Sequence, residues 1–171
     1  PLLDCFNAPC EGGCPIRQDI PEYMELCRTG RYTEALTLIT EKNPLPFTTG
    51  TICAHRCQTK CTRNYYDESV HIRETKLVAA ENGYDALMRS LKKPAPVTDG
   101  RKAAIIGGGP TGIAAAYFLG RAGIPVTVFE RSSRLGGVPM QVIPGFRISD
   151  EAIDNDAKLI EAMGVEIVTG R

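Results

Sequence analysis

The sequence has no excess of charge of either sign, no long apolar run and no cysteine after residue 61. Its 20 basic and 20 acidic residues cancel, which argues against a nucleic-acid-binding surface, because such surfaces carry a basic excess. No apolar run approaches the ~20 residues of a membrane span, and the N-terminus lacks the pattern of a secretory signal peptide. We therefore expect a cytoplasmic protein that neither spans a membrane nor binds nucleic acid.

The chain also lacks internal repeats, low-complexity segments and any Ser-His-Asp or paired-carboxylate arrangement, so no catalytic acid, base or nucleophile is expected. Its 171 residues, of which 43% are hydrophobic, suffice for one large or two small packed domains. Prolines, charges and a glycine make residues 94–100 a predicted linker. We expect a helical, cysteine-rich domain over residues 1–93 and an α/β domain over residues 101–171.

All seven cysteines lie within the first 61 residues, which indicates one local purpose. An odd number cannot pair completely in disulfides, and without a secretion signal metal ligation is favoured. Six candidate metal ligands fall in two closely spaced groups: Cys5, Cys10 and Cys14, and Cys53, Cys57 and Cys61. Cys27 is predicted to be a small core residue on an amphipathic helix that Asp19 caps and Gly30 ends.

The second cysteine group allows two arrangements. Its i, i+4, i+8 spacing would align three sulfurs along one helical face, whereas a series of turns could also bring them together. His55 lies between these cysteines and is expected to be a surface residue rather than a ligand. Thiolates suit iron–sulfur clusters, and structural zinc is the main alternative. Further helices are predicted for residues 31–40 and 69–91.

The second domain begins with a glycine-rich motif in the context of a strand and a helix. An apolar run, residues 102–106, leads into glycines spaced G-x-G-x-x-G, and a helical pattern follows at residues 113–119. Such glycines allow a tight turn, the approach of a pyrophosphate to the backbone, and close packing of helix on strand. The helix N-terminus would face the phosphates. The candidate cofactor-binding residues here are Gly107, Gly109, Pro110, Thr111 and Gly112.

A second strand is predicted at residues 124–129, and Glu130 at its end is placed to hold a ribose hydroxyl. Arg131 stands beside it, and the pair Gly136-Gly137 indicates either a second approach of backbone to cofactor or a plain turn. The irregular apolar stretch 142–147 is expected to cover a cofactor or a partner.

Ser149 is predicted to cap a helix over residues 150–163, and a third strand is expected at 165–168. Because a doubly wound sheet needs more strands, we expect the chain to be a fragment. The remainder would hold the rest of the sheet and a second nucleotide site.

The order of these parts resembles the small (beta) subunit of glutamate synthase, the N-terminal half of dihydropyrimidine dehydrogenase, and related subunits named as selenate reductases. The resemblance covers nearly the whole chain and rests on six stretches: Asn7-Ala8-Pro9-Cys10-x3-Cys14-Pro15, Ile20-Pro21-Glu22, Gly30-Arg31-Tyr32-x2-Ala35-Leu36, Cys53-x3-Cys57-x3-Cys61, Gly107-Gly108-Gly109-Pro110 and Ile143-Pro144-Gly145-Phe146-Arg147. It implies one or two [4Fe–4S] clusters in an α-helical domain and FAD on a partial α/β Rossmann-type domain. NAD(P)H would bind to a second Rossmann unit outside this chain.

The resemblance also implies a ligand set for each cluster: Cys5, Cys10 and Cys61 for one, and Cys14, Cys53 and Cys57 for the other. Leu2 stands where the family has a further cysteine for the first cluster. For the second cluster, relatives supply a carboxylate or amide from the helix that follows. Lys76 falls near that position and is a poor ligand, so Glu74 is the attractive substitute.

The resemblance therefore implies an oxidoreductase that passes electrons from NAD(P)H through FAD and clusters to a redox partner subunit or domain. The alternative is a structural or docking module with zinc-bound or free cysteines and a Rossmann unit that binds NAD. The position of the motif after a cysteine-rich domain and the pair Gly136-Gly137 favour FAD over NAD.

Overall fold

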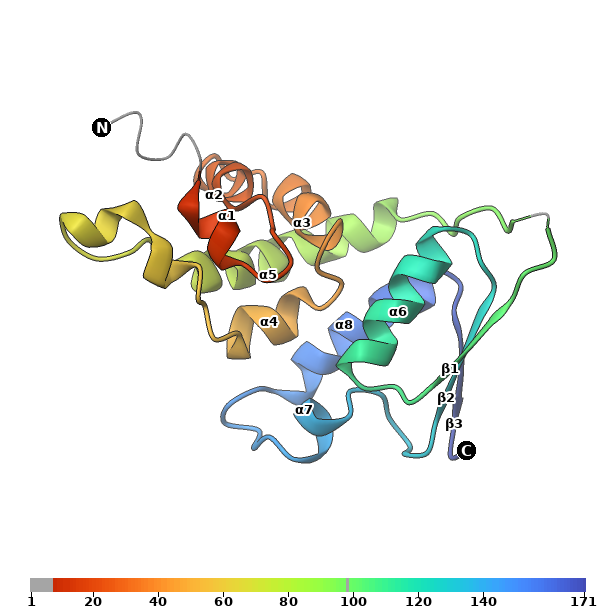
Figure 1. Cartoon of the computed structure of the whole chain (residues 1–171). Coiled ribbons are helices and arrows are strands. Elements are labelled where there is room, and N and C mark those ends of the chain that lie inside the picture. Colours follow the sequence, from red (N-terminus) through yellow and green to blue (C-terminus); the bar gives the residue numbers. More distant parts are fainter. Residues whose placement is uncertain (1–7, 98) are drawn as a thin grey trace. The chain divides into compact units, whose positions relative to one another are not determined.

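The computed structural model describes residues 8–97 and 99–171, so Leu2 and Cys5 lie outside the described residues. The chain divides into two compact units, Pro1–Leu87 and Met88–Arg171 (Figure 1). The domain limits predicted around the linker 94–100 stay a prediction. Within the described ranges, no helix has both the length and the apolar character that crossing a membrane requires.

The first unit consists of helices and short turns. Its elements are α1 (Pro9–Gly13), α2 (Ile20–Arg28), α3 (Tyr32–Thr40), α4 (Pro46–Ile52), the 3-10 turns η1 (Gln58–Lys60) and η2 (Thr62–Tyr65), and α5 (Ile72–Ser90), which continues into the second unit. The predicted helices at 19–30, 31–40 and 69–91 are confirmed as α2, α3 and α5. The short helices α1 and α4 were not predicted, because their glycine, proline and β-branched residues are typical of loops.

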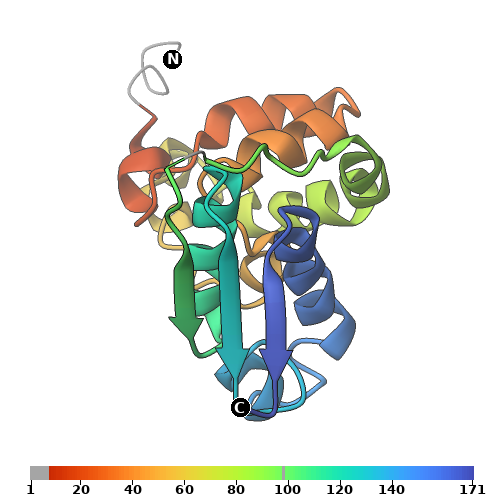
Figure 2. The same cartoon turned by 90° about the vertical axis from the view of Figure 1, so that its right-hand side faces the viewer.

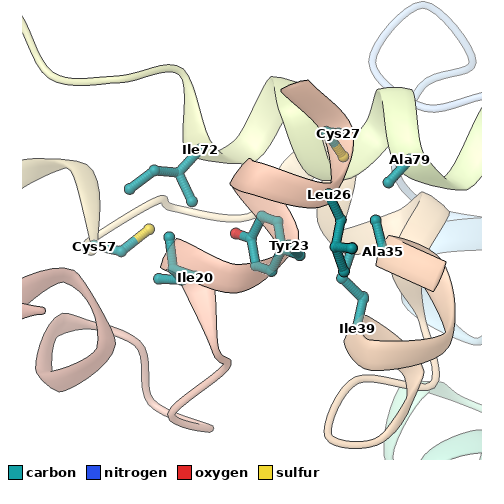
Figure 3. Packing of buried hydrophobic residues seen from close by; sticks show 9 residues of the cluster. All are labelled: Ile20, Tyr23, Leu26, Cys27, Ala35, Ile39, Cys57, Ile72 and Ala79. Atoms are coloured by element: carbon teal, nitrogen blue, oxygen red, sulfur yellow. The ribbon is translucent and has the colours of Figure 1, made fainter. Parts of the chain in front are cut away.

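Apolar side chains from three of these helices, α2, α3 and α5, and from the turn at Cys57 form the core of the first unit (Figure 3). The core residues drawn are Ile20, Tyr23, Leu26, Cys27, Ala35, Ile39, Cys57, Ile72 and Ala79. Cys27 is 8% exposed, and its sulfur lies 3.9 Å from the carbonyl oxygen of Thr75. The prediction that Cys27 is a core residue is confirmed.

The second unit contains a parallel sheet with strand order β1-β2-β3. Its elements are β1 (Ala103–Ile106), α6 (Pro110–Arg121), β2 (Val126–Glu130), α7 (Val138–Gln141), α8 (Asp150–Ala162) and β3 (Glu166–Thr169). Helices α6 and α8 lie on the same face of the sheet and contact each other (Figure 2). Register pairs Ile106 with Phe129, and Glu130 with Thr169. The carboxyl ends of β1 and β2 therefore meet at one edge.

The helix ends test the predicted caps. Ser149 caps α8, because its side-chain oxygen accepts a hydrogen bond from the Ala152 N–H at 3.2 Å. Asp19 is the N-cap residue of α2, as predicted, but its side chain makes no capping hydrogen bond. Gly30, Gly123 and Gly164 follow their helices with φ of 75°, 77° and 80°, the left-handed backbone that glycine adopts without strain.

Candidate functional site

Three of the candidate metal-ligating cysteines line one cavity in the first unit, which we call the thiol cavity. Cys14 follows α1, Cys53 follows α4, and Cys57 precedes η1. The cavity has a volume of about 200 Å³, far more than the ~10–15 Å³ that a single water needs. Thiols far apart in the sequence therefore share a space large enough for a polyatomic group.

The three later cysteines lie on a series of turns and not on one helical face. Helix α4 ends at Ile52, and Cys57 and Cys61 flank the three-residue turn η1. Between Cys53 and Cys57 the backbone reverses at His55, whose φ of 40° is left-handed. Of the two arrangements that the spacing allowed, the structure contains the series of turns.

Cys10 and Cys61 lie near each other, on the α1 side of the same region. Helix α1, which carries Cys10, packs against η1, which Cys61 follows. Burial, with a smaller contribution from the charges of Cys61 and Cys57, raises the pKa of Cys10 to about 11. A metal centre that binds Cys10 must therefore displace its proton at neutral pH. Cys5, the remaining ligand that the resemblance implies, lies outside the described residues.

Amide, imidazole and cationic side chains line the thiol cavity. Besides the cysteines, its lining contains Gln18, Asn43, His55, Arg56, Arg73 and Lys76. Lys76 is only 5% exposed. Burial raises the pKa of the Cys57 thiol, and the Lys76 charge acts in the opposite direction. Within residues 8–97 and 99–171, no carboxylate lines this cavity.

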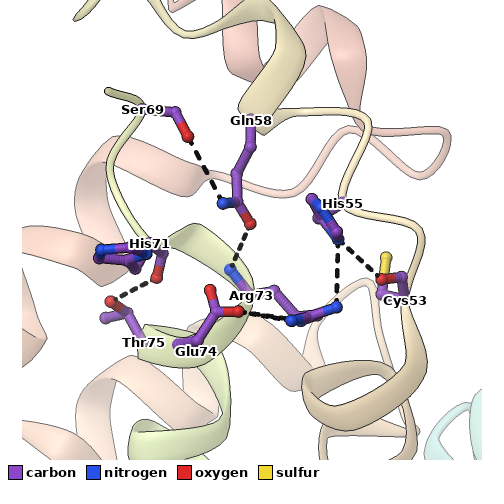
Figure 4. A network of polar contacts seen from close by, with 8 residues as sticks. All are labelled: Cys53, His55, Gln58, Ser69, His71, Arg73, Glu74 and Thr75. Atoms are coloured by element: carbon purple, nitrogen blue, oxygen red, sulfur yellow. Dashed lines mark hydrogen bonds and ion pairs between the residues drawn. The ribbon is translucent and has the colours of Figure 1, made fainter. Parts of the chain in front are cut away.

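Glu74, the predicted substitute ligand, does not line the thiol cavity. It faces a separate hollow with Met24, Cys27 and Tyr32. Its Oε1 accepts a hydrogen bond from Arg73 Nη2 at 2.6 Å (Figure 4). The structure thus corrects this expectation: Lys76 lines the cavity, and Glu74 pairs with Arg73 instead.

His55 is half-buried and belongs to a polar network, so the expectation of a surface histidine is also wrong. Its Nδ1 lies 3.2 Å from the carbonyl oxygen of Cys53 and 3.2 Å from Arg73 Nη1 (Figure 4). Gln58 continues the network, since its side-chain oxygen accepts from the Arg73 backbone N–H at 3.3 Å. These contacts tie the loop that carries Cys53 to the start of α5.

The six described cysteines are all free thiols. In the described parts of the chain, no three Cys, His, Asp or Glu side chains converge closely enough to hold a single metal ion. The three cavity thiols surround a space rather than a point.

In the second unit, the glycine motif forms the turn between β1 and α6. Gly107 has a left-handed φ of 98°, and Gly112 packs so closely that a Cβ atom there would lie 2.0 Å from the Gly107 carbonyl oxygen. Around Gly109 there is room, because a Cβ there would meet only the Gly137 Cα, at 3.8 Å. The first and third glycines thus serve the turn and the packing, and the second leaves open space beside the helix N-terminus.

Glu130 is buried at the end of β2 and binds the glycine loop. Its Oε2 accepts a hydrogen bond from the Gly108 N–H at 2.6 Å, and its Oε1 accepts from the Ser132 N–H at 2.8 Å and the Ser132 hydroxyl at 2.7 Å. The Ser132 backbone and hydroxyl, followed by the Gly108 N–H, hold the pKa of this carboxyl below its usual range. Because a carboxylate has about four acceptor positions, it can still accept a further donor.

The pair Gly136-Gly137 packs against the first glycine loop. The Gly136 N–H donates to the Gly108 carbonyl oxygen at 2.8 Å, and a Cβ on Gly137 would lie 2.9 Å from the Gly109 Cα. Both glycines have positive φ, 116° and 58°. They therefore allow the second loop to lie directly against Gly109, beside the space where a pyrophosphate is expected.

The remaining candidates in the second unit lie at its surface. Thr111 and Arg131 are exposed. In the segment 142–147, which was expected to cover a cofactor or a partner, Val142 is 69% and Phe146 88% exposed. Nothing within the described residues covers these two apolar side chains.

We predict that Glu130→Gln destabilises the protein most at neutral pH. The folded-state pKa of Glu130 is lowered, so its contribution is present above the unfolded-state pKa of about 4.3 and is lost as pH falls through the folded value. Charge-assisted hydrogen bonds contribute about 1.5–3 kcal/mol, and a loss of that order is expected at pH 7. Urea unfolding of both proteins from pH 7 to pH 3 measures it. A difference that stays constant across this range would contradict the prediction.

Comparison with known families matches two parts of the chain. Residues 2–86 match the family described as dihydropyrimidine dehydrogenase domain II, 4Fe–4S cluster. Residues 105–153 match the NAD(P)-binding Rossmann-like domains. The predicted order, a helical iron–sulfur domain followed by a Rossmann-type region, is confirmed at this level.

Relatives at 33–49% identity match nearly the whole chain. YgfK of Escherichia coli K12, whose name marks it as a candidate oxidoreductase, is 49% identical over 99% of the chain and 16% of its own length. The NADPH-Fe(3+) oxidoreductase subunit beta of Geobacter sulfurreducens is 35% identical over 98% of the chain and 25% of its length. The glutamate synthase [NADPH] small chain of Mycobacterium tuberculosis is 33% identical over 98% of the chain and 34% of its own length. The chain thus spans between a sixth and a third of these relatives.

Proposed function

Because the chain belongs to the family of iron–sulfur oxidoreductase subunits that includes the glutamate synthase small chains, we propose that it forms the electron-transfer part of such an enzyme. When bound, FAD would supply the exchange between a two-electron hydride donor, NAD(P)H, and one-electron [4Fe–4S] clusters that lead to a partner domain or subunit. The names of relatives that act with NADPH support the nicotinamide donor.

The thiol cavity is the observation that carries this proposal. Cys14, Cys53 and Cys57 come from two distant segments and line one space of about 200 Å³. Three thiolates bring negative charge, which the buried Lys76 ammonium and the Arg73 guanidinium offset. The residues present therefore fit an iron–sulfur cluster that is held by three cysteines at this site, with Cys10 and Cys61 left for a second cluster.

In the second unit, the chain's own residues would bind and orient the dinucleotide. The N–H groups at the start of α6 and the open side of Gly109 suit a pyrophosphate. Glu130, which keeps acceptor capacity beside Gly108, suits a ribose hydroxyl. None of these groups transfers a proton, which agrees with a site whose task is positioning.

NAD(P) on this Rossmann unit is the second candidate, and the name of the matching family favours it. The two cofactors are distinguished by the visible spectrum of the purified full-length protein, because flavin absorbs there and oxidised nicotinamide does not. A protein that contains stoichiometric nicotinamide and no flavin would overturn the FAD assignment.

The whole proposal is tested by purifying the full-length protein without oxygen and measuring its iron, sulfide, zinc and flavin. We expect a brown protein that contains iron and sulfide in equal amounts together with FAD. A colourless protein with stoichiometric zinc and no iron would instead establish the structural zinc module.

A further inference from the structure

Gln18 is a buried polar side chain without a partner, and it lies in the wall of the thiol cavity. It is 4% exposed, and its amide nitrogen Nε2, which is fully buried, makes no hydrogen bond within the described residues. It lines the cavity together with Cys14, Cys53 and Cys57. A buried amide N–H left unpaired destabilises a fold, so this arrangement needs an explanation.

The surrounding residues supply no acceptor for this nitrogen. The other glutamine of this region, Gln58, bonds to Ser69 and to the Arg73 backbone, and Asn43 in the cavity wall bonds to Thr49 and Leu45. Gln18 differs from both of these amides, because it lines the cavity while the N–H donors of its Nε2 have no partner within the described residues. An acceptor that occupies the cavity would satisfy them.

We propose that the Gln18 amide donates an N–H···S hydrogen bond to the cluster bound by Cys14, Cys53 and Cys57, and thereby raises its reduction potential. This inference rests on the proposed iron–sulfur site. The sulfide and thiolate sulfurs of a cluster accept hydrogen bonds, and such bonds stabilise the more electron-rich reduced state. Gln18 is thus a positioning and tuning residue that does not itself ligate iron.

The position of Gln18 explains why the sequence did not reveal it. It stands four residues after Cys14 and directly before α2, where a polar residue is expected to be solvated. Burial of Ile20 and Tyr23 on α2 turns this stretch inward, so that Gln18 is carried into the cavity wall. Lys76, from α5, lines the same wall.

The test compares Gln18→Leu with the wild type in the full-length protein, purified without oxygen. We expect the variant to keep its iron and sulfide and to have a more negative midpoint potential for one cluster. A tenfold change in the ratio of reduced to oxidised cluster corresponds to ~59 mV for one electron. At a fixed applied potential, we expect this ratio to be twofold to tenfold lower in the variant than in the wild type. Gln141→Leu is the control, because Gln141 lies in the second unit and does not line the cavity, and the cluster potentials of this variant should equal those of the wild type.

A second measurement separates tuning from a structural role. In protein stripped of its clusters, Gln18→Leu should raise the midpoint of urea unfolding, because it removes a buried unpaired amide. A purely structural glutamine would destabilise the stripped protein when replaced.

Each other outcome has a defined meaning. An unchanged potential in Gln18→Leu overturns the hydrogen bond, and a loss of iron from that variant overturns it in favour of direct ligation. A wild-type protein that contains no cluster at all refutes the underlying function rather than this inference alone.

Discussion

Cys57→Ala is expected to remove the iron of one cluster and the corresponding part of the visible absorbance. Cys57 lines the thiol cavity with Cys14 and Cys53, and the substitution leaves the cluster with two of its three thiolates. Iron and sulfide analysis of anaerobically purified protein measures the loss.

Cys27→Ala is the matched control, because it removes the same side-chain atoms from the same apolar core. Cys27 and Cys57 are each 8% exposed and pack in one apolar cluster, so both variants lose similar packing. Cys27 faces a separate hollow, and its variant should keep the wild-type iron content. Equal iron in the two variants would refute the assignment of Cys57 as a ligand.

Gly109→Ala is expected to remove the bound dinucleotide without harming the fold. The backbone at Gly109 is extended, with φ −76° and ψ −177°, which alanine adopts freely. A Cβ there meets only Gly137 Cα, at 3.8 Å, but it would occupy the side on which a pyrophosphate approaches. An affinity loss of at least tenfold, or about 1.4 kcal/mol, should appear as loss of flavin from the full-length protein while the unfolding midpoint stays unchanged.

Two further glycines serve as controls in the same unit. Gly112→Ala forces a Cβ to 2.0 Å from the Gly107 carbonyl oxygen, so it should lower stability by at least the ~1–3 kcal/mol of overpacking. Gly145→Ala meets no atom within 4 Å and should change neither stability nor flavin content. If Gly109→Ala keeps flavin at the wild-type level, the pyrophosphate does not bind where we propose.

Local patterns were reliable wherever one stretch of chain decides the outcome. The periodicity of α2, α3, α5 and α8, and the glycines that end them, follow from backbone and side-chain preferences within a few residues. The conformation of the motif from Gly107 to Gly112 is likewise determined locally, by the left-handed backbone at Gly107 and the close contact between Gly112 and Gly107. The prediction of Cys27 as a core residue succeeded because its helix is amphipathic.

Errors arose where partners come from elsewhere in the chain. Glu74 was attractive as a ligand by spacing alone, but Arg73 binds it and it faces a different hollow. His55 looked like a surface residue, yet Cys53 and Arg73 hold it half-buried. The sequence did not predict the buried position of Gln18 or the helices α1 and α4, because packing against distant segments overrides weak local preferences.

The sequence by itself determined the order of the chain: clustered thiols on a helical scaffold, then a strand, a glycine turn and a helix that together suit a dinucleotide. These features are local, and the spacing of residue types is enough to define them. Only the tertiary structure decided which thiols share a cavity, that Lys76 and Gln18 stand in its wall while Glu74 does not, and that Glu130 anchors the glycine loop. The physical reason is that a cavity and its polar lining are set by the packing of segments distant in the sequence, and no single segment carries that information.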